Sequence, residues 1–260
     1  MLMLAIKIGT EWGQTSEAVP GHRRVGGFYS GVGKQQPAGP ITRRSLVQFQ
    51  PPQPTSMNLT LLVIAKDQSD LNGFDETHIA PPVRLFRYIN ARGHPLAAVA
   101  NCYLDLNLKL NGPHIFGLVH ADMTFGPGSI EAFSDAAESC AIVGACGRAL
   151  DPWPEPPAGI NPGYHWSKWN PGVVSTLDSS CVFFRTDLGL RFDGQTFDGF
   201  HLHVEDLCIQ ASQKGYPVLV PKADAVHSSP DKNGSTWYTD RDRYLRRLIT
   251  KWPGVRFCTT

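Results

Sequence analysis

The sequence lacks the features that mark several large classes of protein. No apolar run approaches the ~18–20 residues that a membrane-spanning helix needs, and the six cysteines form no CxxC pair and no metal-finger spacing. The 24 lysine and arginine residues balance 23 aspartate and glutamate residues, so the net charge of +1 gives no excess for binding nucleic-acid phosphates. We therefore expect a cytoplasmic protein with reduced thiols and no nucleic-acid partner.

The first 56 residues differ in composition from the rest of the chain. Glycine, proline, glutamine and arginine dominate them, and no apolar periodicity persists after Ile8. Such a segment buries too little apolar surface to offset its conformational entropy. We expect residues 1–56 to be either a disordered tail or a mis-annotated extension ahead of a native start at Met57. The second interpretation rests on residues 40–54, which resemble a translated 3′ end of a tRNA gene.

Residues 57–260 show the alternation of an α/β domain. Continuous apolar runs suit strands that are covered on both faces, and apolar stripes with a helical period suit the helices between them. Strands are predicted at 58–65, 83–89, 114–119, 141–144, 173–185 and 217–221, and helices at 95–110, 129–138, 204–214 and 240–252. This order predicts one domain with a mostly parallel sheet flanked by helices.

Polar residues follow the third predicted strand. His120 and Asp122 come directly after it, and ligands of open α/β sheets bind at the carboxyl ends of strands. A carboxylate there can bind Mg²⁺ or Mn²⁺, and the imidazole of His227 can complete such a site. The alternatives are a turn and helix cap for His120 and Asp122, and an ordinary loop histidine for His227.

Charged residues occupy the last two predicted helices. Glu205 and Asp206 stand in the first turn of a helix, where acidic residues either complement the helix dipole or serve as a general base. The closing helix is basic, which indicates a solvated face, contact with anionic lipid headgroups or binding to nucleic acid. Its basic residues are Arg241, Arg243, Arg246, Arg247 and Lys251.

The order of these segments resembles the family-2-like glycosyltransferases of the GT-A type. Residues 200–211, Lys214-Gly-Tyr216 and His227 resemble the second half of that family, and His120-Ala-Asp122 resembles the His-x-Asp form of its DxD element in a bacterial branch. The resemblance covers roughly residues 57–255. It implies a Rossmann-like GT-A domain and a metal-dependent transfer from a nucleotide-diphosphate sugar to an acceptor hydroxyl.

The resemblance also implies roles for individual residues. Asp122 and His227 would bind the Mn²⁺ or Mg²⁺ that holds the donor diphosphate, while Asp206 would be the base and Glu205 would orient the acceptor. The tryptophan-rich segment 151–172 would stack against the acceptor sugar. Five further residues are assigned to the donor side of the site: Asp67, Asn90, Asn101, His120 and Asp178.

A single base, Asp206, favours inversion at the transferred sugar. We expect a hexosyltransferase-like enzyme of glycan or cell-surface polysaccharide synthesis. Its acceptor would be a glycan or a lipid-linked molecule. Peripheral contact with the inner membrane face is a further option. The alternative is a GT-A-fold protein that has lost catalysis and binds sugars or a partner.

Overall fold

The computed structural model describes residues 58–79, 82–91, 93–139, 142–149, 164–228 and 235–257, with side chains described from 240 in the last range. Residues 50–260 form one compact unit. The predictions for residues 1–56 and for Trp153 lie outside the described residues. Among the residues that are described, no helix is long and apolar enough to cross a membrane.

The described elements follow the predicted alternation of strands and helices. In chain order they are β1 (Leu59–Ala65), α1 (Gln68–Asn72), β2 (Val83–Ile89), α2 (Leu96–Asn111), β3 (Ile115–His120), β4 (Met123–Phe125), α3 (Ser129–Ser139), β5 (Ile142–Gly144), β6 (Cys146–Arg148), β7 (Tyr164–Trp166), β8 (Gly172–Val173), β9 (Thr176–Leu177), β10 (Cys181–Arg185), the 3₁₀ helix η1 (Thr186–Leu188), α4 (His203–Gln213), β11 (Val218–Val220), β12 (Ala225–His227) and α5 (Ser235–Lys251).

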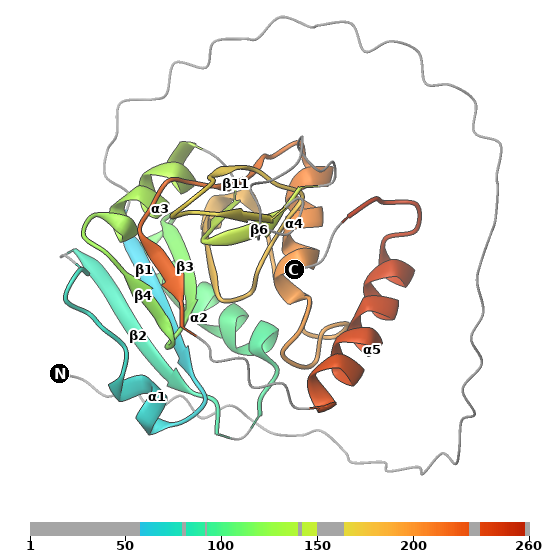
Figure 1. Cartoon of the computed structure of the whole chain (residues 1–260), viewed down its shortest axis with the longest axis horizontal. Helices are drawn as coiled ribbons and strands as arrows, with labels where there is room; N and C mark the ends of the chain where they lie inside the picture. The colour runs from blue at the N-terminus through green and yellow to red at the C-terminus, as the bar shows by residue number, and fades with distance from the viewer. Residues whose placement is uncertain are drawn as a thin grey trace, which may run out of the picture. The chain divides into compact units, whose positions relative to one another are not determined.

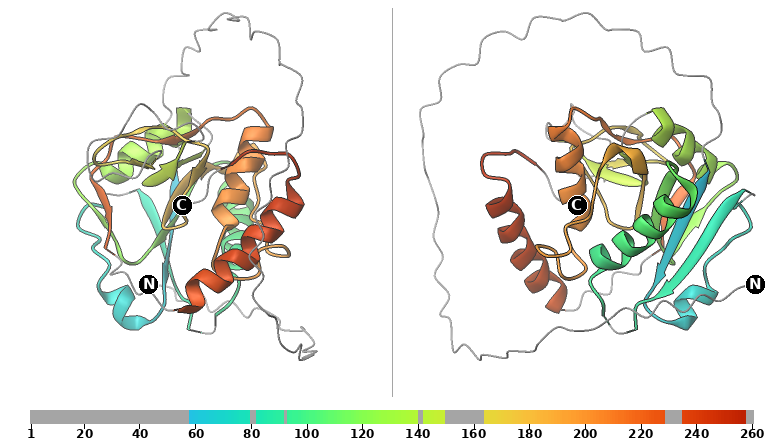
Figure 2. Two further views of the ribbon diagram at one scale, coloured as in Figure 1. Left: turned by 45° about the vertical axis from the view of Figure 1, so that its right-hand side comes forward. Right: turned by 180° about the vertical axis from the view of Figure 1, so that it is seen from behind.

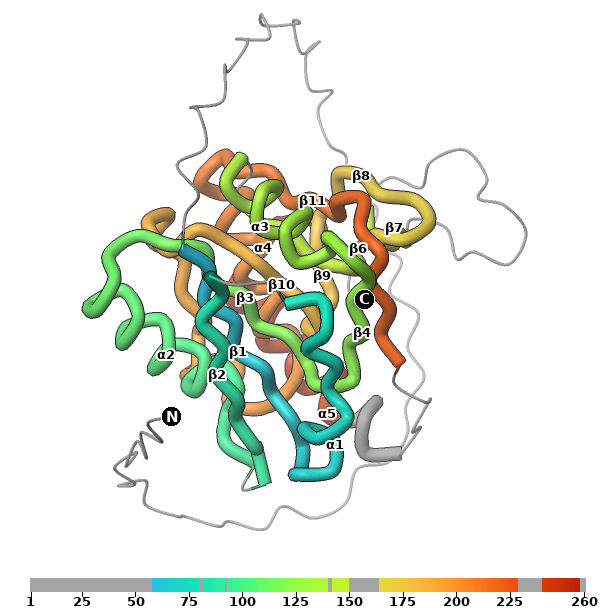
Figure 3. The backbone as a smooth tube through the Cα atoms, turned by 90° about the vertical axis from the view of Figure 1, so that its left-hand side faces the viewer, coloured from blue at the N-terminus to red at the C-terminus, as the bar shows by residue number. Residues whose placement is uncertain are grey.

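The central sheet has seven strands in the order β2-β1-β3-β10-β5-β11-β8. Strands β2, β1 and β3 pair in parallel, as do β5 and β11, whereas β10 runs antiparallel to both of its neighbours and β8 runs antiparallel to β11. Figures 1 and 3 show this sheet with helices around it. The prediction of a mostly parallel sheet flanked by helices is confirmed.

The central strands β1 and β3 are buried on both faces of the sheet. Along β1, Leu62 and Ile64 join the core that packs against α2 and α4, whereas Leu61 and Val63 join the core that packs against α3. Two covered faces explain why the strand is continuously apolar, because successive side chains point to opposite sides. Gly117 in β3 has no room for a side chain, since a Cβ atom there would lie 2.7 Å from the Leu61 and Phe183 side chains.

Two sequence predictions about the second half of the chain are wrong in detail. The apolar run 173–185 does not form one strand but contributes to β8, β9 and β10, because Asp178 turns the chain by accepting a hydrogen bond from the backbone N–H of Ser180 at 2.8 Å. The closing helix α5 begins at Ser235 rather than at residue 240. Tyr244 and Leu248 of this helix are buried, whereas Ile249 is 53% exposed.

Helix α5 is fixed to α4 through a buried carboxylate. Asp206 is fully buried, and it accepts hydrogen bonds from Trp252 Nε1 at 2.7 Å, Gln210 Nε2 at 2.8 Å and Lys251 Nζ at 2.8 Å. The Lys251 ammonium also binds Asp193 at 2.7 Å. A buried carboxylate needs such partners because the loss of hydration otherwise costs several kcal/mol. Figure 2 shows α4 and α5 side by side.

The basic face predicted for α5 is largely used inside the fold. Arg247 pairs with Asp198 at 2.6 Å and donates to the Thr196 carbonyl at 2.8 Å, while Arg243 pairs with Asp240 at 3.4 Å. Lys251 pairs with carboxylates as described above. Three of the five basic side chains therefore have carboxylate partners, which weakens the nucleic-acid and lipid interpretations of this helix.

We predict that Asp206→Asn destabilises the chain by about 3 kcal/mol, because it breaks a buried ion pair. This value is the lower end of the usual range, since the Lys251 side chain is 25% exposed. The free energy of unfolding in urea measures the loss. Asp105→Asn is the matched control, since the Asp105–Arg191 pair is exposed and should contribute less than about 1 kcal/mol. A cost for Asp206→Asn no larger than that of the control would contradict the anchoring role.

Candidate metal centre

Two separate strand ends bring His120, Asp122 and His227 together. His120 ends β3, and the next two residues form the turn into β4. Strand β12 pairs antiparallel with β4 so that His227 lies opposite Met123. The backbone N–H of Ser228 then donates to the Asp122 carbonyl at 2.9 Å, which holds the two segments together. This pairing explains how residues 105 positions apart meet.

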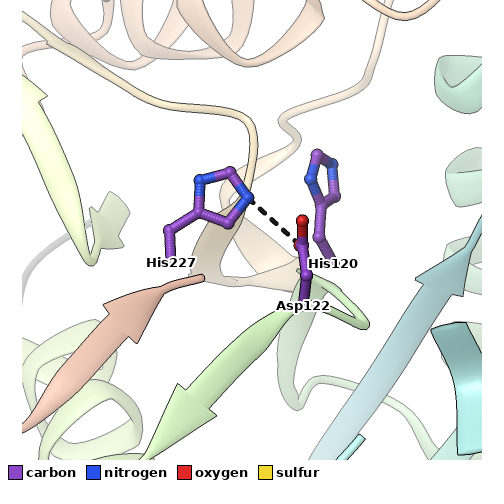
Figure 4. A group of neighbouring side chains, drawn as sticks. All are labelled: His120, Asp122 and His227. Atoms are coloured by element: carbon purple, nitrogen blue, oxygen red, sulfur yellow. Dashed lines mark hydrogen bonds and ion pairs between the residues drawn. The ribbon is translucent and has the colours of Figure 1, made fainter. Parts of the chain in front are cut away.

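The three side chains point toward one another (Figure 4). One ligand atom from each lies within 4.8 Å of the others, and His227 Nε2 is 3.1 Å from Asp122 Oδ1. The Nε2 atom of His120 is buried and has no hydrogen-bond partner among the described residues. A buried imidazole nitrogen without a partner is costly unless a ligand completes it, so this atom indicates a binding site.

The electrostatics of the cluster favour cation binding. Burial lowers the pKa of His120, so its imidazole is neutral and able to ligate. Burial also lowers the pKa of His227, but the hydrogen bond to Asp122 and the charges of Asp178 and Asp122 outweigh it, and the net pKa is raised. For Asp122, burial raises the pKa, but the hydrogen bond and the charge of His227 outweigh that effect, and the net pKa is lowered, so that the carboxylate is ionised.

The donor set fits a divalent transition metal. Two imidazole nitrogens and one carboxylate oxygen would hold Mn²⁺ while leaving positions for substrate oxygens. Mg²⁺ prefers oxygen ligands alone and is therefore a poorer match to His120 and His227. When bound, such an ion would neutralise negative charge on the oxygen atoms of a ligand.

Two further polar residues, Asp178 and His203, lie near the cluster. Asp178 is partly exposed, and its charge raises the pKa values of His120 and His227. His203 is fully buried at the start of α4, and burial lowers its pKa to about 3. Apart from a weak contact with the Phe200 backbone, its ring nitrogens have no hydrogen-bond partner among the described residues.

The chain is strained between the two histidines that precede Glu205. Leu202 has φ of 62°, the left-handed region, and is the only described non-glycine residue with positive φ. This conformation costs a non-glycine residue about 1–2 kcal/mol. It directs the chain from His201 into α4, and strain of this kind often accompanies functional sites. The sequence reasoning did not assign roles to His201 or His203, although their spacing ahead of an acidic pair was a usable signal.

The structure does not fit the catalytic roles expected of Asp206 and Glu205. The Asp206 carboxylate is fully buried and receives three donors from its own fold, so it is closed to a substrate hydroxyl. Glu205 is 3% exposed and is likewise enclosed at the start of α4. The contacts of Asp206 with Lys251 and Trp252 give this carboxylate a structural use, which is to anchor α5.

Three residues expected on the donor side make contacts that shape the backbone instead. Asp67 caps α1 by accepting from the Asp70 N–H at 3.0 Å. The side chain of Asn90 bridges both backbone polar groups of His94, and that of Asn101 bridges those of Phe192. Their donor-binding roles stay predictions that these contacts do not support.

Comparison with known proteins yields likenesses of fold only. No family model matches the sequence, and no curated protein matches it. The structure of A197 from STIV is 14% identical with a TM-score of 0.42, covering 67% of this chain and 87% of that one. GalNAc-T7 with UDP, GalNAc and Mn²⁺ is 10% identical with a TM-score of 0.48, covering 76% of this chain and 49% of that one.

A third solved structure, the inositol-1-phosphate CTP transferase from T. maritima, is 14% identical with a TM-score of 0.34. The match covers 76% of this chain and 79% of that one. The chain spans about half the length of GalNAc-T7. These low TM-scores and identities establish no function, so the functional argument rests on the geometry of the cluster.

We predict that Mn²⁺ affinity falls as the pH is lowered from about 8 to about 6. The raised pKa of His227 lets a proton compete with the metal, whereas His120 with its lowered pKa stays neutral. When one proton competes with the metal, the Mn²⁺ affinity falls by at most about tenfold for each pH unit below the pKa of that group. Titration calorimetry of the full chain with MnCl₂ at a series of pH values measures the slope.

Two single variants separate the histidines in this experiment. His120→Asn should weaken binding but keep the pH slope, and His227→Asn should weaken binding and flatten it. An undiminished slope in His227→Asn would show that another group competes with the metal.

Proposed function

We propose that this chain is a metal-dependent glycosyltransferase of the GT-A type that uses a nucleotide-diphosphate sugar. The observation that carries the proposal is the meeting of His120, Asp122 and His227 at the carboxyl end of β3 in a mostly parallel sheet. Ligands of such sheets bind at that edge. A single divalent ion there suits a substrate whose leaving group is a diphosphate.

In this reaction Asp178, and not Asp206, would be the base that accepts the proton of the acceptor hydroxyl. Asp178 is partly exposed, and its charge acts on both imidazoles of the metal cluster. The Ser180 N–H fixes one carboxylate oxygen at 2.8 Å. A carboxylate held in this way is suited to take the proton from an acceptor hydroxyl. Attack by that hydroxyl on the anomeric carbon would proceed with inversion.

The acceptor in this proposal is a glycan or a lipid-linked glycan, and the transferred group is a hexose. Such an activity belongs to the synthesis of glycans or cell-surface polysaccharides. The support is chemical: Asp178 directly follows β9 of a small sheet that carries aromatic rings, which suit pyranose stacking, and its charge acts on the histidines of the cluster. Peripheral membrane contact fits only a lipid-linked acceptor and is not needed for the chemistry.

A second candidate is a related protein that binds nucleotide sugars without transferring them. The enclosed Asp206 carboxylate favours it, because the residue that the family resemblance assigns as the base is closed off here. Both candidates require the metal cluster. They differ in whether Asp178 serves as a base.

We predict that UDP-, GDP- or dTDP-sugars stabilise the full chain only in the presence of a divalent cation. A ligand at a hundred times its Kd adds about 2.7 kcal/mol of stability, which for a domain of this size raises Tm by roughly 5–10 °C. A thermal-shift panel with Mn²⁺, Mg²⁺ and EDTA measures the effect, and we expect Mn²⁺ to outperform Mg²⁺. If no nucleotide sugar raises Tm under any of these conditions, the proposed function is wrong.

A pair of variants tests the roles of the two accessible carboxylates. Asp122→Asn should abolish the Mn²⁺-dependent shift, because it removes the oxygen ligand. Asp178→Asn should keep the shift and reduce nucleotide release from the donor by about a hundredfold or more, the usual size of a general-base contribution. Asp105→Asn, an exposed change on α2, is the control for both measurements. Full turnover in Asp178→Asn would exclude it as the base.

A further inference from the structure

A short loop leads into helix α4 and passes beside α5 (Figure 1); we call residues 193–202 the Phe200 loop. It begins with a turn in which the Asp193 side chain accepts from the backbone N–H groups of Gln195 at 3.0 Å and Thr196 at 2.9 Å. The Phe197 N–H then donates to the Asp193 carbonyl at 2.9 Å. Because aspartate side chains stabilise turns in this way, the loop starts from a defined conformation.

Helix α5 holds the middle of the Phe200 loop. The Tyr244 hydroxyl donates to Asp198 Oδ1 at 2.9 Å, and Arg247 donates to the same atom at 2.6 Å. Arg247 also donates to the Thr196 carbonyl at 2.8 Å. Tyr244 is 2% exposed and packs with Phe197 in a small apolar cluster. Hydrogen bonds to an ionised carboxylate are stronger than neutral ones, so the loop is fastened to α5.

The backbone next to Phe200 is confined on both sides. A Cβ atom on Gly199 would lie 2.1 Å from the Tyr244 hydroxyl oxygen, so no side chain fits there. The Gly199 carbonyl accepts from the Leu96 N–H, at the start of α2, at 3.4 Å. On the other side, Leu202 has φ of 62° and packs in the same apolar cluster as Tyr244. Phe200 is therefore placed by the residues around it in the chain.

The ring that this backbone presents lies against a ligand of the candidate metal centre. The centroids of Phe200 and His120 are 5.1 Å apart, and their planes are inclined by 44°. Phe200 is 44% exposed. Substitutions of partly exposed side chains outside the core usually cost little stability, so this contact can be tested without unfolding the chain.

The two histidines of the cluster are oriented in different ways. His227 Nε2 donates to Asp122 Oδ1 at 3.1 Å. The ring of His120 makes no hydrogen bond to another described residue, and its Nε2 atom is buried. A ligating imidazole is usually oriented by a hydrogen bond of its other ring nitrogen, and without one its orientation depends on packing. Since His227 is itself a candidate ligand, the contact with Phe200 is the one that can supply this packing.

We propose that Phe200 is a positioning residue for the metal ligand His120. The phenyl ring packs against the imidazole and keeps its ligating nitrogen directed into the cluster, and it does not touch the ion. The contacts of Asp198 with α5 hold Phe200 in place. The inference rests on the proposed function only in taking the cluster as a metal site, and it requires neither a nucleotide sugar nor an acceptor.

This arrangement couples α5 to the metal centre. If the Phe200 loop loosens, the His120 ring gains freedom, and that freedom has to be lost again when an ion binds. Metal affinity should therefore fall when a contact between the loop and α5 is removed. Coupling between two sites is reciprocal, so a bound ion should in turn stabilise the docked position of the loop.

The first test is the Mn²⁺ affinity of the full chain, measured by titration calorimetry without nucleotide. Phe200→Ala should weaken binding about tenfold, the lower end for residues that orient a metal ligand. Phe200→Tyr keeps the ring and should restore most of the loss. Leu110→Ala is the matched control, since it truncates another exposed apolar residue, at the far end of α2. Unfolding of metal-free Phe200→Ala in urea should stay close to that of this control.

A double-mutant cycle separates positioning from a general loosening of the fold. In a His120→Asn background, Phe200→Ala should weaken Mn²⁺ binding by less than about twofold, because the ring that it positions is gone. In a His227→Asn background, Phe200→Ala should keep its full effect. Residues that act through one another are non-additive in this way, whereas an unspecific structural change would add to both backgrounds equally.

A further pair of variants tests the contact with α5. Tyr244→Phe keeps the buried ring and removes the hydroxyl that donates to Asp198, so it should weaken Mn²⁺ binding about threefold. Tyr103→Phe is the control, because Tyr103 is a partly buried tyrosine of α2 that packs against Phe86 of β2. Equal Mn²⁺ affinity in Tyr244→Phe and its control would show that α5 has no part in the positioning.

Several results would overturn the positioning role of Phe200. They are an unmodified chain that binds no Mn²⁺, unchanged affinity in Phe200→Ala, an equal loss in the His120→Asn background, and no recovery in Phe200→Tyr. If His120→Asn binds too weakly to measure, the recovery in Phe200→Tyr decides. Mn²⁺ binding that depends on Phe200, without any nucleotide-sugar shift, would leave the positioning role standing and remove the transferase. An intact nucleotide-sugar shift with unchanged Mn²⁺ affinity in Phe200→Ala would remove the positioning role alone.

Discussion

The buried charge of Asp206 is the constraint on which the candidate site depends. A carboxylate with no exposed surface must be neutralised, and Lys251 and Trp252 at the end of α5 do this. The Lys251 ammonium also holds Asp193, so the same interaction ties down the start of the loop before α4. That loop delivers Phe200 to within 5.1 Å of the His120 ring, measured between centroids.

The antiparallel direction of β10 brings Asp178 to the candidate site. Because β10 runs antiparallel to β3, the turn that precedes it lies beside the carboxyl end of β3, and the His120 N–H donates to the Ser180 carbonyl at 2.8 Å. Asp178 stands in the same turn. A purely parallel sheet would place that turn at the opposite edge. The antiparallel strand therefore makes possible a site with a metal cluster and a separate carboxylate.

The sequence allowed the sheet to be predicted because its strands are continuously apolar and separated by clear helical stripes. It also drew attention to His120, Asp122 and His227, because ligands of open α/β sheets bind at the carboxyl ends of strands, although a turn, a cap or a loop histidine would look the same in the sequence. It failed at 173–185, where β-strand propensity is high throughout and only tertiary pairing decides that Asp178 breaks the run. It also failed at Asp206, because a first-turn carboxylate looks the same whether it faces a substrate or a lysine 45 residues away.

The fate of Asp206 also limits how the reaction can be arranged. If that carboxylate anchors α5, a base must come from another element, and the register of the small sheet places Asp178 in the same row as Trp166. Asp178 is then the point where the metal side and the aromatic side of the site meet. In the proposed reaction, a donor held at the cluster and a sugar stacked on the rings of Trp166 and Trp169 would both approach this one carboxylate. In the proposed reaction β3, the turn after it and β12 would supply the metal ligands, and the small sheet of β6, β7 and β9 would supply the acceptor surface.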